Sequence, residues 1–314
     1  MFTMMNSGRI SAGLEGIGVA ERAWQQALAY ARSRIQGRDA ATGADAAIIR
    51  HADVRRMLML MRSRVEAMRA LAYWSAAAQD VAAHHPDESK RIRYAAFVDL
   101  MTPVVKGWCT EVGLDIAQLG IQIHGGAGYM EETGAIQHVR DLRVSTIYEG
   151  TTGIQAQDFV GRKISRDGGR AIRALIAEMG ETLEDLRTFA ASTHASYGID
   201  ARVLHDALFE GVDELSTAVD RLLASKGEND PRTASVGFVS FLHLMGTVCG
   251  GWMSAKAACV ALRKMKARDS DTFYQSKLVT ARFYAEHVMP QAAMHSRIAR
   301  GDGHSALRIA DADL

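Results

Sequence analysis

Proline is scarce in this chain, and its scarcity restricts the fold more than any other feature of the sequence. Only 4 of the 314 residues are Pro, whereas Ala, Leu, Met and Arg are abundant. These four residue types are good helix formers, and proline is the main breaker of helices. A hydrophobic content of 48% supports a sizeable core at this length. The sequence therefore predicts an all-α protein.

Apolar residues recur at helical spacing over four long segments of the first half. In the first of them, Gly13 and Gly16 would let a neighbouring helix approach closely. The third follows the break at His84–Asp87 and contains Pro103, where a kink is expected. Between residues 125 and 150 the periodicity fails, which predicts a loop with short elements. Together these segments predict a four-helix unit, with helices at about residues 10–28, 46–79, 88–121 and 152–165.

A glycine-rich break separates the two halves of the chain. The run Asp167-Gly168-Gly169 interrupts the helical pattern, and a new amphipathic series begins at Ile172. We therefore place a domain boundary there, between a helical domain at residues 1–166 and a helical extension at residues 167–314. The fold prediction is a four-helix bundle followed by a second helical bundle, with helices at about 201–225, 232–266 and 271–299 and a turn at 227–231.

The segment Val236–Met253 is nearly uncharged and about as long as the shortest membrane span. Polar and small residues such as Ser240, His243 and Gly250 dilute its apolar character. We therefore favour a buried helix of a multi-helix core over a membrane span.

Charge and cysteine content exclude several classes of protein. A formal net charge of +1 gives no overall field that would attract nucleic acid or an anionic membrane. Cys109, Cys249 and Cys259 are too few and too scattered for a disulfide framework or a zinc cluster. The first residues lack the charged and apolar regions of a signal peptide. We expect a cytoplasmic protein without a metal site.

Two short runs carry the candidate chemistry. In Ile147–Thr151, a lone carboxylate, Glu149, stands between a bulky aromatic residue and a glycine, as a general base with burial-raised proton affinity would. In Gln122–Tyr129, three glycines would let the backbone come close to a ligand. Taken alone, Glu149 is as readily a surface carboxylate, and the glycines a helix stop followed by a turn. The glycine run follows a helix rather than a strand, which excludes a Rossmann site.

The first half resembles the C-terminal helical domain of the acyl-CoA dehydrogenases. Four anchors match that family in order over roughly residues 1–165: the helix containing Arg9, the segment from Tyr30 to Gly37, the run Gln122–Tyr129, and Arg140-Asp141 leading to Ile147–Thr151. The extension is similar to that of the subgroup containing 3-methylmercaptopropionyl-CoA dehydrogenase. The resemblance implies the fold already predicted from the helical pattern.

The resemblance also implies a reaction. Glu149 would remove the α-proton of an acyl-CoA thioester while a hydride leaves the β-carbon for FAD. The backbone N–H of Glu149 would help to stabilise the enolate oxygen, together with a ribityl hydroxyl of the flavin. Tyr148 would wall the pocket, and Gly150 would leave room for flavin and substrate. Thr151 would contact the flavin, and Arg9 would lie near the substrate.

Other matched residues imply an oligomer. Arg34 would bind the FAD pyrophosphate of a neighbouring subunit, as suits a planar and permanently charged group. Gln122 and Gly126 would hold the adenosine end across the same interface. A homodimer or homotetramer is therefore expected, with an electron-transfer flavoprotein as electron acceptor. Some relatives place their base at the position of Gly8; a glycine cannot act as a base, which leaves Glu149 as the candidate.

Complete members of this family begin with a helical domain and a middle β-domain, and this sequence starts almost at the first helix of the third domain. We therefore expect either a fragment of a longer enzyme or one partner of an assembly. Two functions remain open. One is acyl-CoA dehydrogenation, and the other is a non-catalytic helical oligomerisation module or partner subunit. Retention of Glu149, Arg34, Gln122 and Gly126 favours the first, because a scaffold has no physical need for them.

Overall fold

The computed structural model describes residues 2–192, 195–224, 231–267 and 271–314, and it confirms an all-α protein. Three long helices form the centre of the first half, and α1 packs along both of the others. They are α1 (Phe2–Ser33), α2 (Ala52–His84) and α3 (Glu88–His124). A small antiparallel hairpin, β1 (Ile35–Arg38) and β2 (Asp45–Ala47), and a short 3-10 turn, η1 (Ile48–Arg50), connect α1 to α2.

Helix α3 begins and ends where the sequence places the signals. The side chain of Asp87 accepts a hydrogen bond from the N–H of Ser89, which caps the first turn. The helix ends at Gly125, whose φ of 61° favours a residue without a side chain. Pro103 lies inside the helix, which continues through it without a break. The preceding break at His84–Asp87 is confirmed.

The segment between Gly125 and Gly150 is more ordered than its sequence suggests. It contains α4 (Gly126–Tyr129), the 3-10 turn η2 (Glu131–Thr133) and the 11-residue helix α5 (Ala135–Ser145). The prediction of a loop with short elements is wrong for α5. This helix buries few side chains, Leu142 among them, against α1 and α3, so its apolar pattern is too sparse to recognise.

The fourth predicted helix is present with an irregular second half. It starts as α6 (Thr152–Gln157), capped by the side chain of Thr151, and continues as a π-helical segment, η3 (Asp158–Ile164). Such wide turns are rare and are frequently found at functional sites.

Two glycines bring α1 and α3 into backbone contact, as the sequence predicts. A Cβ atom on Gly13 would lie 2.7 Å from the carbonyl oxygen of Val105, and one on Gly16 would lie 2.8 Å from that of Cys109. Any larger residue would therefore force the two helices apart.

The second half forms a helical layer around one apolar helix. Its longer helices are α7 (Arg170–Ser192), α8 (Ala195–Ala224), α10 (Phe238–Lys266), α11 (Thr272–His287) and α12 (Gln291–Ala299). The short elements are α9 (Pro231–Ser235), α13 (His304–Arg308) and η4 (Asp311–Asp313). The predicted helix over 271–299 is two helices, interrupted before Pro290. Residues 227–230 of the predicted turn lie outside the described residues.

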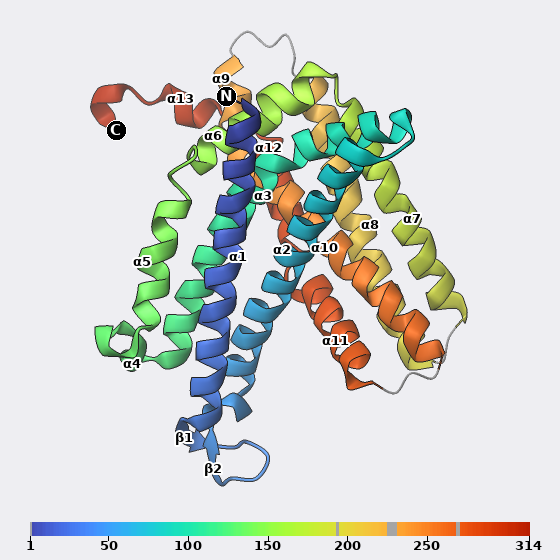
Figure 1. Cartoon of the computed structure of the whole chain (residues 1–314). Helices are drawn as coiled ribbons and strands as arrows, with labels where there is room; N and C mark the ends of the chain where they lie inside the picture. Colours follow the sequence, from blue (N-terminus) through green and yellow to red (C-terminus); the bar gives the residue numbers. More distant parts are fainter. Residues whose placement is uncertain (1, 193–194, 225–230, 268–270) are drawn as a thin grey trace.

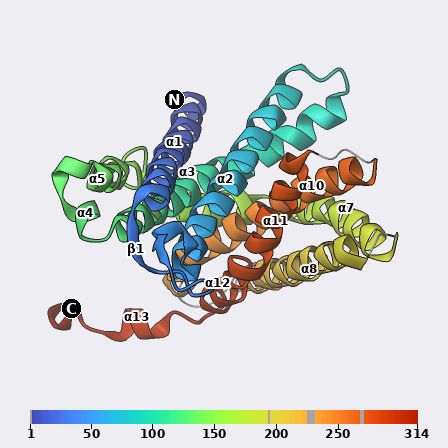
Figure 2. The ribbon, with the colours of Figure 1, turned by 90° about the horizontal axis from the view of Figure 1, so that it is seen from below.

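Helix α10 joins the two halves. It packs against α2, α3 and α6 of the first half and against α7, α8, α11 and α12 of the second half. Figure 2 shows α1 and α5 at one flank of the molecule and α7 and α8 at the other, with α2, α3 and α10 between them. The helix is long and apolar enough to cross a membrane, yet 72% of its apolar window is buried in the protein. Its apolar surface therefore serves the core. The domain boundary near residue 167 stays a prediction.

Candidate active site

Glu149 lies in a strained turn between α5 and α6. Its φ of 56° makes it the one non-glycine residue with a positive φ in the part of the chain that the structure describes. A left-handed conformation costs an L-residue about 1–2 kcal/mol. Gly150 follows with a φ of 96°. Strain of this kind collects at functional sites, and here it falls on the residue that the sequence singles out.

The same turn presents unused backbone donors. The N–H groups of Glu149, Gly150 and Thr151 have no acceptor among the described residues. Consecutive free amides form a cradle that suits an anionic oxygen. The arrangement therefore supplies a carboxylate and hydrogen-bond donors within three residues.

The Glu149 side chain rests against the start of α1. A Cβ atom on Gly8 would lie 3.3 Å from both Cδ and Oε2 of Glu149. Glu149 as a whole residue is half-buried. Tyr148 does not enclose it: this side chain is 41% exposed, and its hydroxyl donates to the carboxylate of Glu15, which raises the pKa of Tyr148 to about 12. Glu149 is thus partly exposed in this chain, and the role of Tyr148 as a wall of the pocket stays a prediction.

Two residues that sequence reasoning missed support the turn from beneath. Lys106 on α3 is fully buried, and its Nζ donates to the carbonyl oxygen of Gly150 at 2.7 Å. Gln155 on α6 is also fully buried, and its Nε2 donates to the carbonyl oxygens of Glu149 at 3.1 Å and Gly150 at 3.2 Å. One signal was available, because Lys106 is the only charged residue between Asp99 and Glu111.

Thr152 anchors the end of the turn to α3 and α5. Its N–H donates to the carbonyl oxygen of Thr146 at 3.2 Å, and its Oγ1 donates to Oε1 of Glu111 at 2.5 Å. The strained conformation is thus held from both ends, as persistent backbone strain requires.

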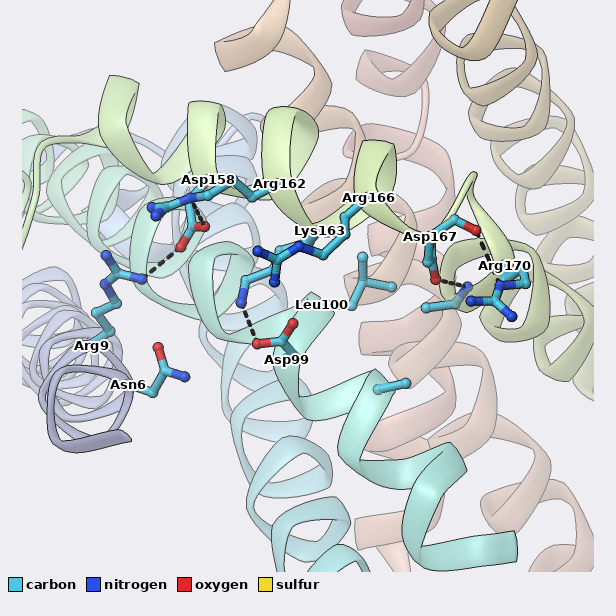
Figure 3. A pocket seen from close by; sticks show the side chains of 12 residues that line it. Asn6, Arg9, Asp99, Leu100, Asp158, Arg162, Lys163, Arg166, Asp167 and Arg170 are labelled. Carbon is cyan, nitrogen blue, oxygen red and sulfur yellow. Dashed lines mark hydrogen bonds and ion pairs between the residues drawn. The ribbon is translucent and has the colours of Figure 1, made fainter. Parts of the chain in front are cut away.

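Arg9 lies deep in an ion-pair cluster beside this turn. It is 4% exposed, and its Nη1 is 2.7 Å from Oδ2 of Asp158, whose other oxygen is 2.8 Å from Nε of Arg162 (Figure 3). The Nε of Arg9 is buried and has no partner among the described residues. Arg9 therefore joins α1 to η3, and its predicted contact with a substrate stays a prediction.

A pocket of about 560 Å³ opens beside Arg9, between α1, α3, η3 and the start of α7. Five cationic and three acidic side chains line it (Figure 3). The carboxylate of Asp167 accepts hydrogen bonds from the N–H groups of Gly169 and Ala171 at the start of α7. Lys163 forms an ion pair with Asp99. The pocket is therefore net positive, and Arg9, which lines it, follows Gly8 directly in the sequence.

The other predicted cofactor residues lie at a second place. Arg34 and Gly126 line a hollow of about 460 Å³ together with Tyr30 and His124. The Arg34 side chain is exposed and has no partner in the described chain, and Gly126 faces open space. Gln122 is exposed and does not line this hollow. His124 is buried and packs against Tyr30, with the centroids of the two stacked rings 4.4 Å apart.

The Glu149 turn and the hollow beside Arg34 lie at opposite ends of α1. Figure 1 shows the start of α1 near α6 and its other end at the β1–β2 hairpin, with α4 at the same end of the molecule as the hairpin. From Arg9 to Ser33 the helix rises by roughly 36 Å. This separation exceeds the length of an extended dinucleotide. Glu149 and Thr151 share one turn because they are neighbours in the sequence, whereas Arg34 and Gly126 are brought together by the fold in a separate group.

Other reactive groups are sequestered or isolated. Burial raises the pKa of the thiols of Cys109, Cys249 and Cys259, so none is a ready nucleophile. Among the described residues, no three His, Cys, Asp or Glu side chains gather as a metal site would require.

Comparison with known proteins confirms the resemblance. The family model described as "Acyl-CoA dehydrogenase, C-terminal domain" matches residues 1–164, and the one described as "Acetyl-CoA dehydrogenase C-terminal like" matches residues 175–310. The chain is 42% identical to the 3-methylmercaptopropionyl-CoA dehydrogenase of Ruegeria pomeroyi, over 95% of this chain and 50% of that protein. It is 31% identical to the broad-specificity linear acyl-CoA dehydrogenase FadE5 of Mycobacterium tuberculosis, over 92% of this chain and 48% of that protein.

A solved structure shares the fold. The acyl-CoA dehydrogenase of Bacillus anthracis, solved with FAD, superposes with a TM-score of 0.69 at 17% identity, over 99% of this chain and 50% of that one. The chain spans about half the length of the curated relatives it matches. Because one family model covers more than half of the sequence, the chain belongs to the acyl-CoA dehydrogenase family and carries its C-terminal helical region.

Proposed function

We propose that this chain carries the catalytic base of an FAD-dependent acyl-CoA dehydrogenase. The observation that carries the proposal is the strained turn of Glu149, which places a carboxylate beside three free amide N–H groups. The reaction oxidises the bond between the α- and β-carbons of an acyl-CoA thioester. The relatives named for 3-methylmercaptopropionyl-CoA and for linear acyl-CoA support this substrate class.

The residues of the turn have separate tasks in this reaction. The carboxylate of Glu149 takes the α-proton, and the electrons of that C–H bond move towards the thioester carbonyl. A free N–H of the same turn donates to the carbonyl oxygen as negative charge develops on it. Gly150 adopts its positive φ without a steric penalty, and its lack of a side chain leaves room for Nε2 of Gln155, which a Cβ atom there would approach to 2.7 Å. Bound FAD supplies the acceptor for the hydride that leaves the β-carbon.

The residues around Arg34 fit the other end of such a cofactor. An unpaired guanidinium beside an open hollow suits a pyrophosphate, and Gly126 leaves the hollow unobstructed. The separation from Glu149 along α1 means that one FAD within one chain cannot use both places. We therefore propose a homo-oligomer, a dimer or a tetramer, in which Arg34, Gln122 and Gly126 serve a neighbouring copy. We further propose that an electron-transfer flavoprotein accepts the electrons from FAD and that the protein is located in the cytoplasm.

The test combines a spectrum with an assay. The purified chain is measured for flavin absorption in the visible range and then assayed with acyl-CoA substrates and an artificial electron acceptor. We expect flavin to be bound, and Glu149→Gln to abolish turnover while the flavin spectrum remains. Glu132→Gln is the matched control, because Glu132 is an exposed glutamate outside the turn. Absence of both flavin and turnover would leave the helical oligomerisation module as the function of this chain.

A further inference from the structure

We propose that Lys106 and Gln155 are a positioning pair that holds the Glu149–Gly150 backbone in its left-handed conformation and aims its amides at the substrate. The inference rests on the proposed function of Glu149. Neither residue belongs to the turn: Lys106 comes from α3 and Gln155 from α6. Their three hydrogen bonds converge on two successive carbonyl oxygens, those of Glu149 and Gly150.

The direction of these carbonyl groups fixes the direction of the amides. A peptide unit is planar and trans, so the carbonyl of one residue and the N–H of the next point in opposite directions. Lys106 and Gln155 are fully buried, and the two carbonyls they bind therefore face the protein interior. The N–H groups of Gly150 and Thr151 must then point away from Lys106 and Gln155. This accounts for their lack of an acceptor among the described residues.

Lys106 occupies a costly position for a purely structural residue. It has no exposed surface, and no carboxylate of the described chain lies within 4 Å of its ammonium group. Lysine is almost never fully buried without an ionic partner, because desolvation of the ammonium is expensive. Burial lowers the pKa of Lys106 to about 8, against a partial opposing effect of Glu111. A methionine would fill the same space without this cost, so the retained ammonium indicates a task at Gly150.

The second half of the chain covers the region around Lys106 and Gln155. A Cβ atom on Gly107 would lie 2.6 Å from Cδ2 of Leu242 on α10 and 3.3 Å from Cβ of Gln155. Helix α10 therefore packs directly over the residue that follows Lys106, and it brings the extension against the underside of the turn. The extension thus contributes to the site by excluding water from the Lys106 hydrogen bond, although it supplies no residue to the turn itself.

Hydrogen exchange tests the proposal independently of turnover. The full chain and its Lys106→Met variant are compared by mass spectrometry for amide exchange in peptides covering residues 146–155. The free amides of residues 149–151 exchange rapidly in both proteins, so the comparison follows the hydrogen-bonded amides of Thr152 and Gln155, which flank them. Loss of the charge-assisted bond to Gly150 should raise exchange at these two amides by roughly 10- to 100-fold. The melting temperature should stay equal or rise, since a desolvated charge has been removed. In steady-state assays kcat should fall roughly 10- to 100-fold with KM nearly unchanged, because the carboxylate and amides lose their alignment.

Lys264→Met is the matched control, because Lys264 is exposed on α10 and its loss removes the same charge far from the turn. It should leave exchange in 146–155 and kcat unchanged. Unaltered exchange in Lys106→Met would overturn the positioning pair whatever the activity does. Raised exchange with an unchanged kcat would overturn it too, since Lys106 would then act on the fold alone. If the unsubstituted chain shows no turnover, the proposed function fails, and the exchange comparison still decides whether Lys106 holds the turn.

Discussion

Gly8 lies directly against the carboxylate of Glu149. A Cβ atom at Gly8 would sit 3.3 Å from Cδ and from Oε2 of Glu149, although the two residues are far apart in the sequence. Residue 8 is the position at which some relatives are expected to carry their base. The structure therefore places residue 8 and Glu149, the two base positions that the resemblance implies, side by side.

Gly8→Ala should separate stability from activity. Alanine raises helix propensity, so the free energy of unfolding should rise by up to about 1 kcal/mol. The new methyl group presses on the Glu149 carboxylate, and kcat/KM should fall roughly tenfold or more. Thermal unfolding and steady-state kinetics measure the two effects. Gly18→Ala is the control, because a Cβ at Gly18 on the same helix meets nothing within 4 Å; equal activity in both variants would contradict the expectation.

Gly13→Ala should destabilise the protein through the contact between α1 and α3. A Cβ at Gly13 would lie 2.7 Å from the carbonyl oxygen of Val105, and backbone there cannot yield without moving the helix. Overpacking of this kind costs about 1–3 kcal/mol, which outweighs the gain in helix propensity. Denaturant unfolding measures the change. A variant as stable as Gly18→Ala would show that the two helices separate freely.

Lys106 should make stability depend on pH above neutrality. Burial lowers its pKa from 10.5 to about 8 in the folded protein. Between these two values the unfolded chain binds more protons than the folded one, so the unfolding free energy contributed by this group rises with pH. The contribution of Lys106 to the unfolding free energy is fully present above pH 10.5 and is lost as the pH falls through about 8. Denaturant titrations across this window should show a steeper rise for the unsubstituted chain than for Lys106→Met; parallel profiles would exclude a buried, titrating Lys106.

Thr182→Val should destabilise the extension by about 1–3 kcal/mol, because it leaves a buried donor unpaired. The indole Nε1 of Trp252 donates to Oγ1 of Thr182 at 2.9 Å, and Trp252 is fully buried. Valine keeps the shape and removes the acceptor. Chemical unfolding followed by tryptophan fluorescence measures the loss. Thr188→Val, at an exposed position of the same helix, should change stability little.

Helices with a strong local pattern were predictable, and weakly patterned ones were not. The break before α3 and the close approach at Gly13 and Gly16 follow from residue types alone, because capping and steric size are local properties. Helix α5 was missed because its burial depends on a groove between α1 and α3, which the local sequence does not encode.

For the site, the sequence by itself determined which carboxylate to examine. The setting of Glu149 between Tyr148 and Gly150 singles it out, and the order of the matched runs determined the family. Tertiary structure alone decided how that carboxylate is held. Lys106 and Gln155 reach the turn from α3 and α6, and Gly8 reaches it from α1. The reason is physical: strain in a backbone persists only when surrounding groups over-determine it, and those groups come from segments that folding alone brings together.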